Sequence, residues 1–123
     1  MSIQNGWIGV DLDGTLAYYD EWRGIEHIGQ PVPLMLARVK DWVAEGRDVR
    51  IFTARAYRML YPVGTPEHTE AQQVIRVIHD WLKLHQLPPL PVTCFKDFGM
   101  TELWDDRAVQ ILTNTGLRAD LEL

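Results

Sequence analysis

The sequence is poor in cysteine and in long apolar runs. It contains one cysteine, Cys94, which cannot form an internal disulfide, so we expect a reducing, cytoplasmic setting. No apolar run approaches the roughly 20 residues that a membrane helix needs. The first residues also lack the basic and apolar regions of a secretory signal. These absences predict a protein with no membrane partner.

Positive charge is also scarce. The 12 Lys and Arg residues are outnumbered by 17 Asp and Glu residues, which gives a net charge of −5. Broad binding to a nucleic-acid backbone requires a basic face, so this balance argues against it. It leaves open the binding of one phosphate in a metal-loaded pocket. The length of 123 residues, with 46% apolar residues, predicts a single domain over 1–123.

Apolar patterning predicts strands that alternate with helices. One helix is expected from Pro33 to about Gly46, and another from the cap Thr65-Pro66-Glu67 to about His85. Short apolar runs predict strands at residues 7–11, 49–52, 92–95, 102–104 and 108–112, and Asn114-Thr115-Gly116 predicts a turn. Strands that alternate with helices are typical of an α/β fold with a mostly parallel sheet.

Polar side chains follow four of these predicted strands. Ligands of such sheets bind beyond the carboxyl ends of the strands, so these residues are expected to share one edge. They are Asp11 and Asp13 after the first strand, Thr53 after the second, Lys96 after the third, and Asp105 and Asp106 after the fourth.

The four aspartates predict a cation. Asp11 and Asp13 are two residues apart, so in an extended chain their side chains point to the same side. Carboxylates this close repel one another unless a proton or a cation neutralises one of them. With Asp105 and Asp106 at the same edge, the oxygen-rich set favours Mg²⁺.

At these residues the chain resembles the haloacid dehalogenase-like (HAD) phosphohydrolase superfamily. Residues 11–15, DLDGT, match its first motif, and Thr53 in FTAR matches the second. Lys96 in FKDF matches the third, and Asp105-Asp106 in LWDDRA the fourth. The match runs in the family's order from residue 7 to about residue 112. The resemblance implies a small Rossmann-like, HAD-type three-layer domain without a cap domain.

The resemblance also implies a reaction and a role for each motif residue. Asp11 would be the nucleophile that forms an aspartyl-phosphate, and Asp13 the general acid and then the general base. Mg²⁺ would be held by Asp11, by the backbone carbonyl of Asp13, and by Asp105 and Asp106. The activity implied is that of a phosphatase, because dehalogenases of the superfamily lack an acid at the position of Asp13.

The remaining candidate residues would bind the substrate phosphate. Thr15 and Thr53 would donate hydrogen bonds to its oxygens, and Lys96 would offset its charge. Arg55 belongs to a basic and aromatic cluster, completed by Tyr57, Arg58 and Tyr61, that could bind a phosphate or stack on a base. A solvated loop is the alternative interpretation of this cluster.

Two features depart from the family pattern. Only eight residues separate Lys96 from Asp105, too few for the crossover helix that joins parallel neighbours. A cap domain is also missing, although residues 16–32 or the loop at 56–66 could form a small lid. An open site favours a substrate on a larger molecule, or a lid from a second subunit in a homo-oligomer.

Other functions remain open. A phosphoacceptor module of the response-regulator type also uses an acid pair, an acceptor aspartate, a threonine and a lysine. Its acid pair lies on the first strand, however, whereas here the pair Asp105-Asp106 comes last. A non-catalytic binding module on the same fold is a third interpretation. The phosphorylated substrate could be a nucleotide, a sugar phosphate or a nucleic-acid end.

Overall fold

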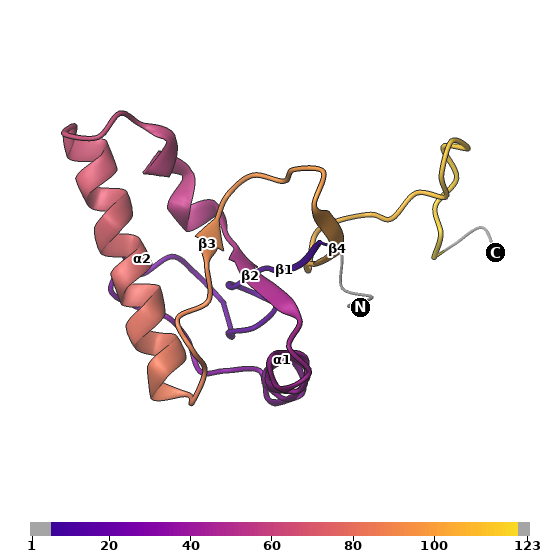
Figure 1. Ribbon diagram of the computed structural model, residues 1–123, viewed down its shortest axis with the longest axis horizontal. Helices are drawn as coiled ribbons and strands as arrows, with labels where there is room; N and C mark the ends of the chain where they lie inside the picture. Colours follow the sequence, from indigo (N-terminus) through magenta and orange to yellow (C-terminus); the bar gives the residue numbers. More distant parts are fainter. Residues whose placement is uncertain (1–5, 121–123) are drawn as a thin grey trace.

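The computed structural model describes residues 6–120 and contains one parallel sheet. Its strands are β1 (Trp7–Val10), β2 (Asp48–Phe52), β3 (Val92–Thr93) and β4 (Met100–Trp104). They are ordered β3-β2-β1-β4, and every neighbouring pair is parallel. The first strand therefore lies in the interior of the sheet, between β2 and β4 (Figure 1).

Helices connect the first three strands. They are α1 (Pro33–Ala44), the 3₁₀ helix η1 (Ala54–Leu60) and α2 (Pro66–Leu84). Proline stands at the start of both α-helices, where its missing N–H costs no hydrogen bond. The side chain of Thr65 caps α2 by accepting a hydrogen bond from the backbone N–H of His68.

The core lies between the sheet and the α-helices. All four residues of β1 are buried, and α2 contributes Val74, Ile78 and Leu82 to the same cluster. Leu12, in the segment that follows β1, is fully buried as well. Its burial leaves the flanking residues 11 and 13 at the rim of the core, which is where the candidate site forms.

The fold class is confirmed: the chain is an α/β protein, and its sheet is consistent with a small Rossmann-like three-layer domain. Four predicted strands and both predicted α-helices are present with shifted ends. The third strand ends at Thr93 rather than at residue 95, and the fourth begins at Met100 rather than at residue 102. The predicted loop at 56–66 begins inside η1, since residues 54–60 form a 3₁₀ helix.

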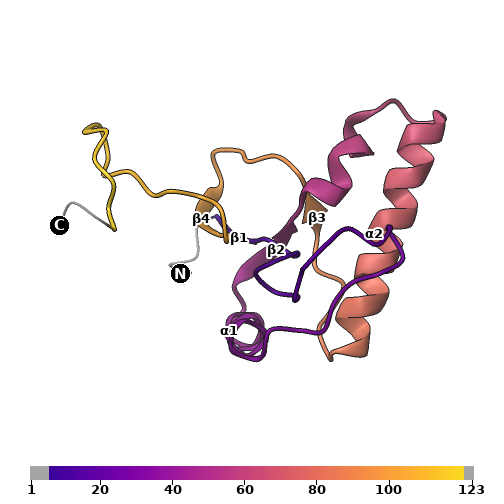
Figure 2. The ribbon, with the colours of Figure 1, turned by 180° about the vertical axis from the view of Figure 1, so that it is seen from behind.

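The prediction of a fifth strand at residues 108–112 is wrong. The chain turns after β4 because the backbone N–H groups of Arg107 and Ala108 donate to the side chain of Asp105. Residues 105–120 then extend away from the sheet, as the views from both sides show (Figures 1 and 2). Ile111 forms only an isolated bridge with Arg118. The predicted turn at 114–116 lies inside this bridge, with a left-handed Asn114.

None of the helices in the described part of the chain has the length and apolarity needed to span a bilayer.

Candidate functional site

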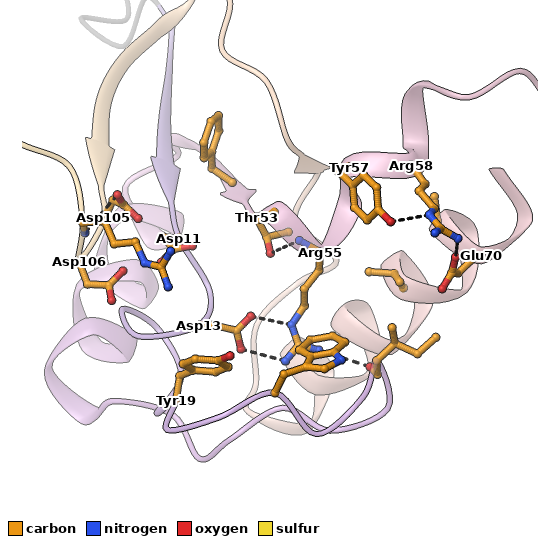
Figure 3. Close-up of a pocket in the computed structure, with 17 residues that line it drawn as sticks. Asp11, Asp13, Tyr19, Thr53, Arg55, Tyr57, Arg58, Glu70, Asp105 and Asp106 are labelled. Atoms are coloured by element: carbon orange, nitrogen blue, oxygen red, sulfur yellow. Dashed lines mark hydrogen bonds and ion pairs between the residues drawn. The ribbon is translucent and has the colours of Figure 1, made fainter. Parts of the chain in front are cut away.

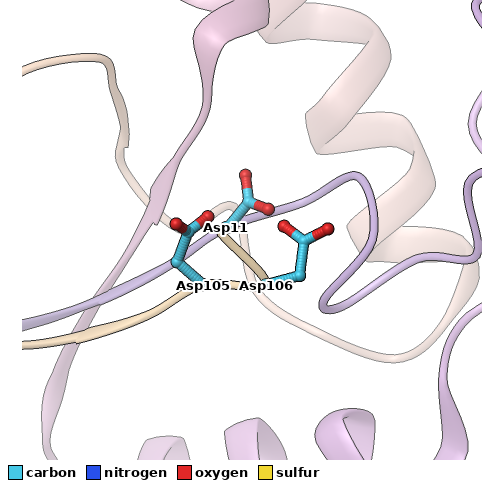
Figure 4. Close-up of side chains that lie close together, drawn as sticks. All are labelled: Asp11, Asp105 and Asp106. Carbon is cyan, nitrogen blue, oxygen red and sulfur yellow. The ribbon is translucent and has the colours of Figure 1, made fainter. Parts of the chain in front are cut away.

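Three carboxylates converge at the carboxyl edge of the sheet. Val10 pairs with Trp104, and the backbone N–H of Asp11 continues this pairing with a 2.9 Å hydrogen bond to the carbonyl of Trp104. The next residue of each strand, Asp11 or Asp105, therefore leaves the sheet at the same level. The side chains of Asp11, Asp105 and Asp106 each place an oxygen within 4.8 Å of the other two (Figure 4).

Backbone geometry orients this acidic cluster. One oxygen of Asp105 accepts hydrogen bonds from the N–H groups of Arg107 and Ala108, at 3.3 and 2.9 Å. Gly14 has a φ of 89°, and a Cβ atom there would collide with the carboxylate of Asp106. Glycine therefore suits position 14 because of its backbone conformation, and a side chain there would displace the Asp106 carboxylate from its present position.

The crowding of carboxylates changes the ionisation of Asp11. Burial, followed by the negative charge of Asp105 and contact with Asp106, raises the pKa of Asp11 from 3.8 to about 8. Each of these causes disfavours a second or third negative charge. A divalent cation would remove the same repulsion, so the raised pKa of Asp11 indicates where such an ion would be most strongly attracted.

The donor set fits Mg²⁺. The oxygens of an octahedral magnesium shell lie roughly 3 to 4 Å apart, because each is about 2.1 Å from the ion. The cluster oxygens, all within 4.8 Å of one another, need only a small closure to reach that spacing. Hard carboxylate oxygens are also the ligands that Mg²⁺ prefers. Asp11, Asp105 and Asp106 could therefore hold this ion.

The side chain of Asp13 is paired with an arginine. Both of its oxygens accept hydrogen bonds from Arg55, at 2.6 Å from Nε and 2.9 Å from Nη2 (Figure 3). The Arg55 side chain is 5% exposed and the Asp13 side chain 20% exposed. A bidentate pair in such a shielded place fixes the direction of the Asp13 carboxylate.

Arg55 also ties the segment at 16–32 to the site. Its guanidinium donates to the carbonyls of Ile25 and His27, at 3.4 and 2.8 Å. It lies 4.8 Å from the centre of the Trp22 ring, in a cation–π arrangement. Arg55, a predicted phosphate ligand, therefore holds residues 16–32, a predicted small lid, against the pocket.

A pocket of about 620 Å³ opens beside the acidic cluster. Its walls come from the ends of β1, β2 and β4, from the segment at 16–32, from η1 and from the start of α2. Thr53, which is 2% exposed, lies in the wall with its hydroxyl accepting from the N–H of Arg55 at 3.1 Å. In Figure 3 Asp11, Asp105 and Asp106 lie at one end of the pocket, and Tyr57, Arg58 and Glu70 lie at the other.

The structure thus brings together most of the residues predicted from the sequence. Those that line the pocket are Asp11, Asp13, Thr53, Arg55, Asp105 and Asp106. Thr15 is absent from the lining, but its hydroxyl donates to Asp11 at 3.3 Å. Lys96 lies in the exposed loop between β3 and β4 and does not line the pocket.

Sequence reasoning missed two of the charged residues that line the pocket. Arg107 follows the acid pair directly, and its position next to a predicted site was a usable signal. Glu70 lies in the first turns of α2 and forms an ion pair with Arg58. A charged residue on an exposed helix turn carries no sequence signal of this kind.

Comparisons with known proteins bear on the fold alone. No protein-family model matches the chain, and no curated protein matches it. A solved structure of a conserved protein from Bacteroides thetaiotaomicron is similar, with a TM-score of 0.53 and 18% sequence identity. The similarity covers 85% of this chain and 78% of that one. It supports the α/β architecture described above.

Proposed function

We propose that this protein is a Mg²⁺-dependent phosphatase that hydrolyses phosphomonoesters through an aspartyl-phosphate. The observation that carries the proposal is the convergence of Asp11, Asp105 and Asp106 within 4.8 Å at the sheet edge. Asp13, on the same turn of chain as Asp11, lines the same pocket. A nucleophile, an acidic ion site and an acid/base group together are the parts that this reaction requires.

Asp11 would act as the nucleophile. One of its carboxylate oxygens attacks phosphorus, and the bond between phosphorus and the ester oxygen breaks. Bound Mg²⁺ would supply neutralisation of charge on the phosphoryl group and on the carboxylates around it. Thr15, whose hydroxyl donates to the Asp11 carboxylate at 3.3 Å, would fix the orientation of the nucleophile. Thr53, buried in the pocket wall, would donate to a phosphate oxygen.

Asp13 would transfer the protons. It donates one to the departing ester oxygen, then takes one from the water that attacks the aspartyl-phosphate, which releases phosphate and regenerates Asp11. In its ionised form Asp13 would be oriented by Arg55 through these two hydrogen bonds, as the general base needs. For the acid step Asp13 must first take up a proton, which requires one of the two hydrogen bonds from Arg55 to open. Because the donors of Arg55 already contact Asp13 and two backbone carbonyls, we favour this positioning role over direct phosphate binding.

The test is a phosphatase screen of the purified protein with and without Mg²⁺. Nucleotides, sugar phosphates and 5′-phosphorylated oligonucleotides serve as substrates, and Asp11→Asn is the control. We expect phosphate release that requires Mg²⁺ and falls at least about 1,000-fold in Asp11→Asn, since nucleophilic attack is lost. Turnover that persists in Asp11→Asn rules out the nucleophile assignment.

A further inference from the structure

The pocket is larger than a phosphate needs. Its volume of about 620 Å³ is in the range of sites that enclose whole small molecules. The acidic cluster occupies one end, and the opposite end is formed by residues that have no part in the proposed reaction (Figure 3). This distal end is defined by Tyr57, Arg58 and Glu70. Its chemistry indicates what the rest of the substrate is.

Aromatic rings are exposed along this pocket. Tyr19, Trp22 and Tyr57 line it, with exposed fractions of 44%, 53% and 55%. Burial of a large aromatic side chain lowers the free energy, so exposed rings gathered around one pocket mark a place where a ligand packs. A planar ligand such as a nucleobase stacks on such rings with little dependence on its identity.

The polar groups of the distal end are arranged for hydrogen bonding. Arg58 donates to the hydroxyl of Tyr57 at 2.6 Å and forms an ion pair with Glu70. The side chains of this pair are 38% and 41% exposed, so the pair adds little to folding stability. A guanidinium and a carboxylate side by side can donate to the carbonyl or ring nitrogen of a base and accept from its amino group.

The charge balance separates a mononucleotide from a nucleic-acid end. A polynucleotide needs a row of cations along its backbone, whereas this chain carries a net charge of −5. Of the three cations that line the pocket, Arg55 is paired with Asp13 and Arg58 with Glu70, and Arg107 directly follows the acid pair Asp105-Asp106. The lining residues therefore form no row of cations that leads out of the pocket.

We infer that the distal end is a base-binding subsite, and that the substrate class is the nucleoside 5′-monophosphates. This inference rests on the proposed function for the position of the phosphate, which would lie at the acidic cluster. The base would stack against Tyr57 and meet Arg58 and Glu70 with its polar edge. A sugar phosphate would leave the distal end empty.

Binding and turnover are measured separately to test this. Calorimetry with the Asp11→Asn protein and Mg²⁺ compares AMP, GMP, CMP and UMP with ribose 5-phosphate, which lacks only the base. We expect nucleotides to bind at least about tenfold more tightly, the gain expected from stacking one base. In that background Tyr57→Ala should remove the difference and Tyr57→Phe should keep it. Tyr61→Ala is the matched control, since Tyr61 is also exposed, at 44% against 55% for Tyr57, and lies outside the pocket lining.

The outcomes distinguish this inference from the proposed function. Nucleotides that bind preferentially to the chain but are not hydrolysed by the unaltered protein would support the subsite and reject the phosphatase. Ribose 5-phosphate that binds as tightly as AMP, or an equal loss in Tyr57→Ala and Tyr61→Ala, overturns the subsite. Tighter binding of a 5′-phosphorylated oligonucleotide than of AMP, or no binding of any of these probes, also overturns it.

Discussion

Arg55 holds the carboxylate of Asp13 through two parallel hydrogen bonds, of 2.6 and 2.9 Å, although the two residues are 42 positions apart in the chain. Asp13 follows the first strand, and Arg55 lies in η1 after the second. The pair therefore couples two strand ends and, through the carbonyls of Ile25 and His27, the segment at 16–32. It is the structural link between the proposed acid/base group and the pocket wall.

Removing this link should affect both stability and rate. Arg55→Met leaves the largely shielded Asp13 carboxylate without its partner, so we expect the free energy of unfolding to fall by on the order of 3 kcal/mol. Denaturant titration measures this. Turnover of a phosphomonoester should also fall, with kcat affected more than KM, because Asp13 would lose its direction rather than its contact with substrate.

An exposed ion pair in the same region provides the control. Arg23 pairs with Asp20, and their side chains are 45% and 74% exposed. Arg23→Met should change stability by less than about 1 kcal/mol and leave kcat unchanged. Equal effects of Arg23→Met and Arg55→Met would show that the buried pair has no special role.

The raised pKa of Asp11 makes stability and metal binding depend on pH. In the metal-free folded protein this pKa is about 8, against 3.8 as the ordinary value. Between these values the folded state retains a proton that the unfolded state has lost. The contribution of Asp11 to stability is therefore complete below about pH 4 and is lost as the pH rises through 8. We expect the melting temperature of the metal-free protein to fall over this range.

The affinity for Mg²⁺ should rise with pH, whereas the melting temperature of the metal-free protein falls. Below pH 8 the ion must displace the proton of Asp11, so its affinity should weaken as the pH falls, by up to about tenfold per unit. Calorimetry at pH 7 in buffers of different ionisation enthalpy should detect release of about one proton per bound ion. An affinity independent of pH between 6 and 8 would contradict the assignment of Asp11 as a ligand. Asp11→Asn should remove the part of the fall in the metal-free melting temperature that the titration of Asp11 causes.

The acidic cluster could be predicted from sequence because it depends on strand ends. Short apolar runs locate β1, β2 and β4, and the parallel sheet brings the residues that follow them to one edge. This rule places Asp11, Thr53 and Asp105 correctly in the pocket. It needs only the order of the elements, not the details of their packing.

Contacts between side chains of distant segments could not be predicted in the same way. The partner of Asp13 depends on the path of η1, which the sequence presented as a loop. Lys96 was expected directly after a strand, but β3 ends at Thr93, whose hydroxyl hydrogen-bonds Phe95 as the chain bends. Lys96 is thereby carried into an exposed loop. The apolar residues at 108–112 suggested a strand, but the turn at Asp105 directs them away from the sheet.

Lys96 and Arg107 should contribute differently to turnover. Arg107 lines the pocket next to Asp106, whereas Lys96 is exposed outside it. We expect Arg107→Met to raise KM for a phosphomonoester by about tenfold, since a cation that lines the pocket directly after the acid pair is lost. Lys96→Met should change KM and kcat by less than about threefold. A large loss of kcat in Lys96→Met would instead support the role that the resemblance implies for Lys96 and would require the loop at 94–99 to close on the substrate.

The last prediction concerns Asp13 and separates a phosphatase from a phosphoacceptor module. Asp13→Asn removes the proposed proton donor but leaves the carboxylates of the acidic cluster in place, so Mg²⁺ should bind with an affinity within about threefold of the parent. Turnover should fall by about 100- to 10,000-fold, the usual contribution of general acid and base catalysis. The loss should be largest for alkyl phosphates, whose leaving oxygen needs a proton, and smallest for para-nitrophenyl phosphate. An aspartyl-phosphate on Asp11 should also persist longer in Asp13→Asn than in the parent, as quenched-flow trapping with labelled substrate can measure. If the parent itself keeps its phosphoryl group for minutes, Asp13 does not activate water, and the phosphoacceptor interpretation is the better one.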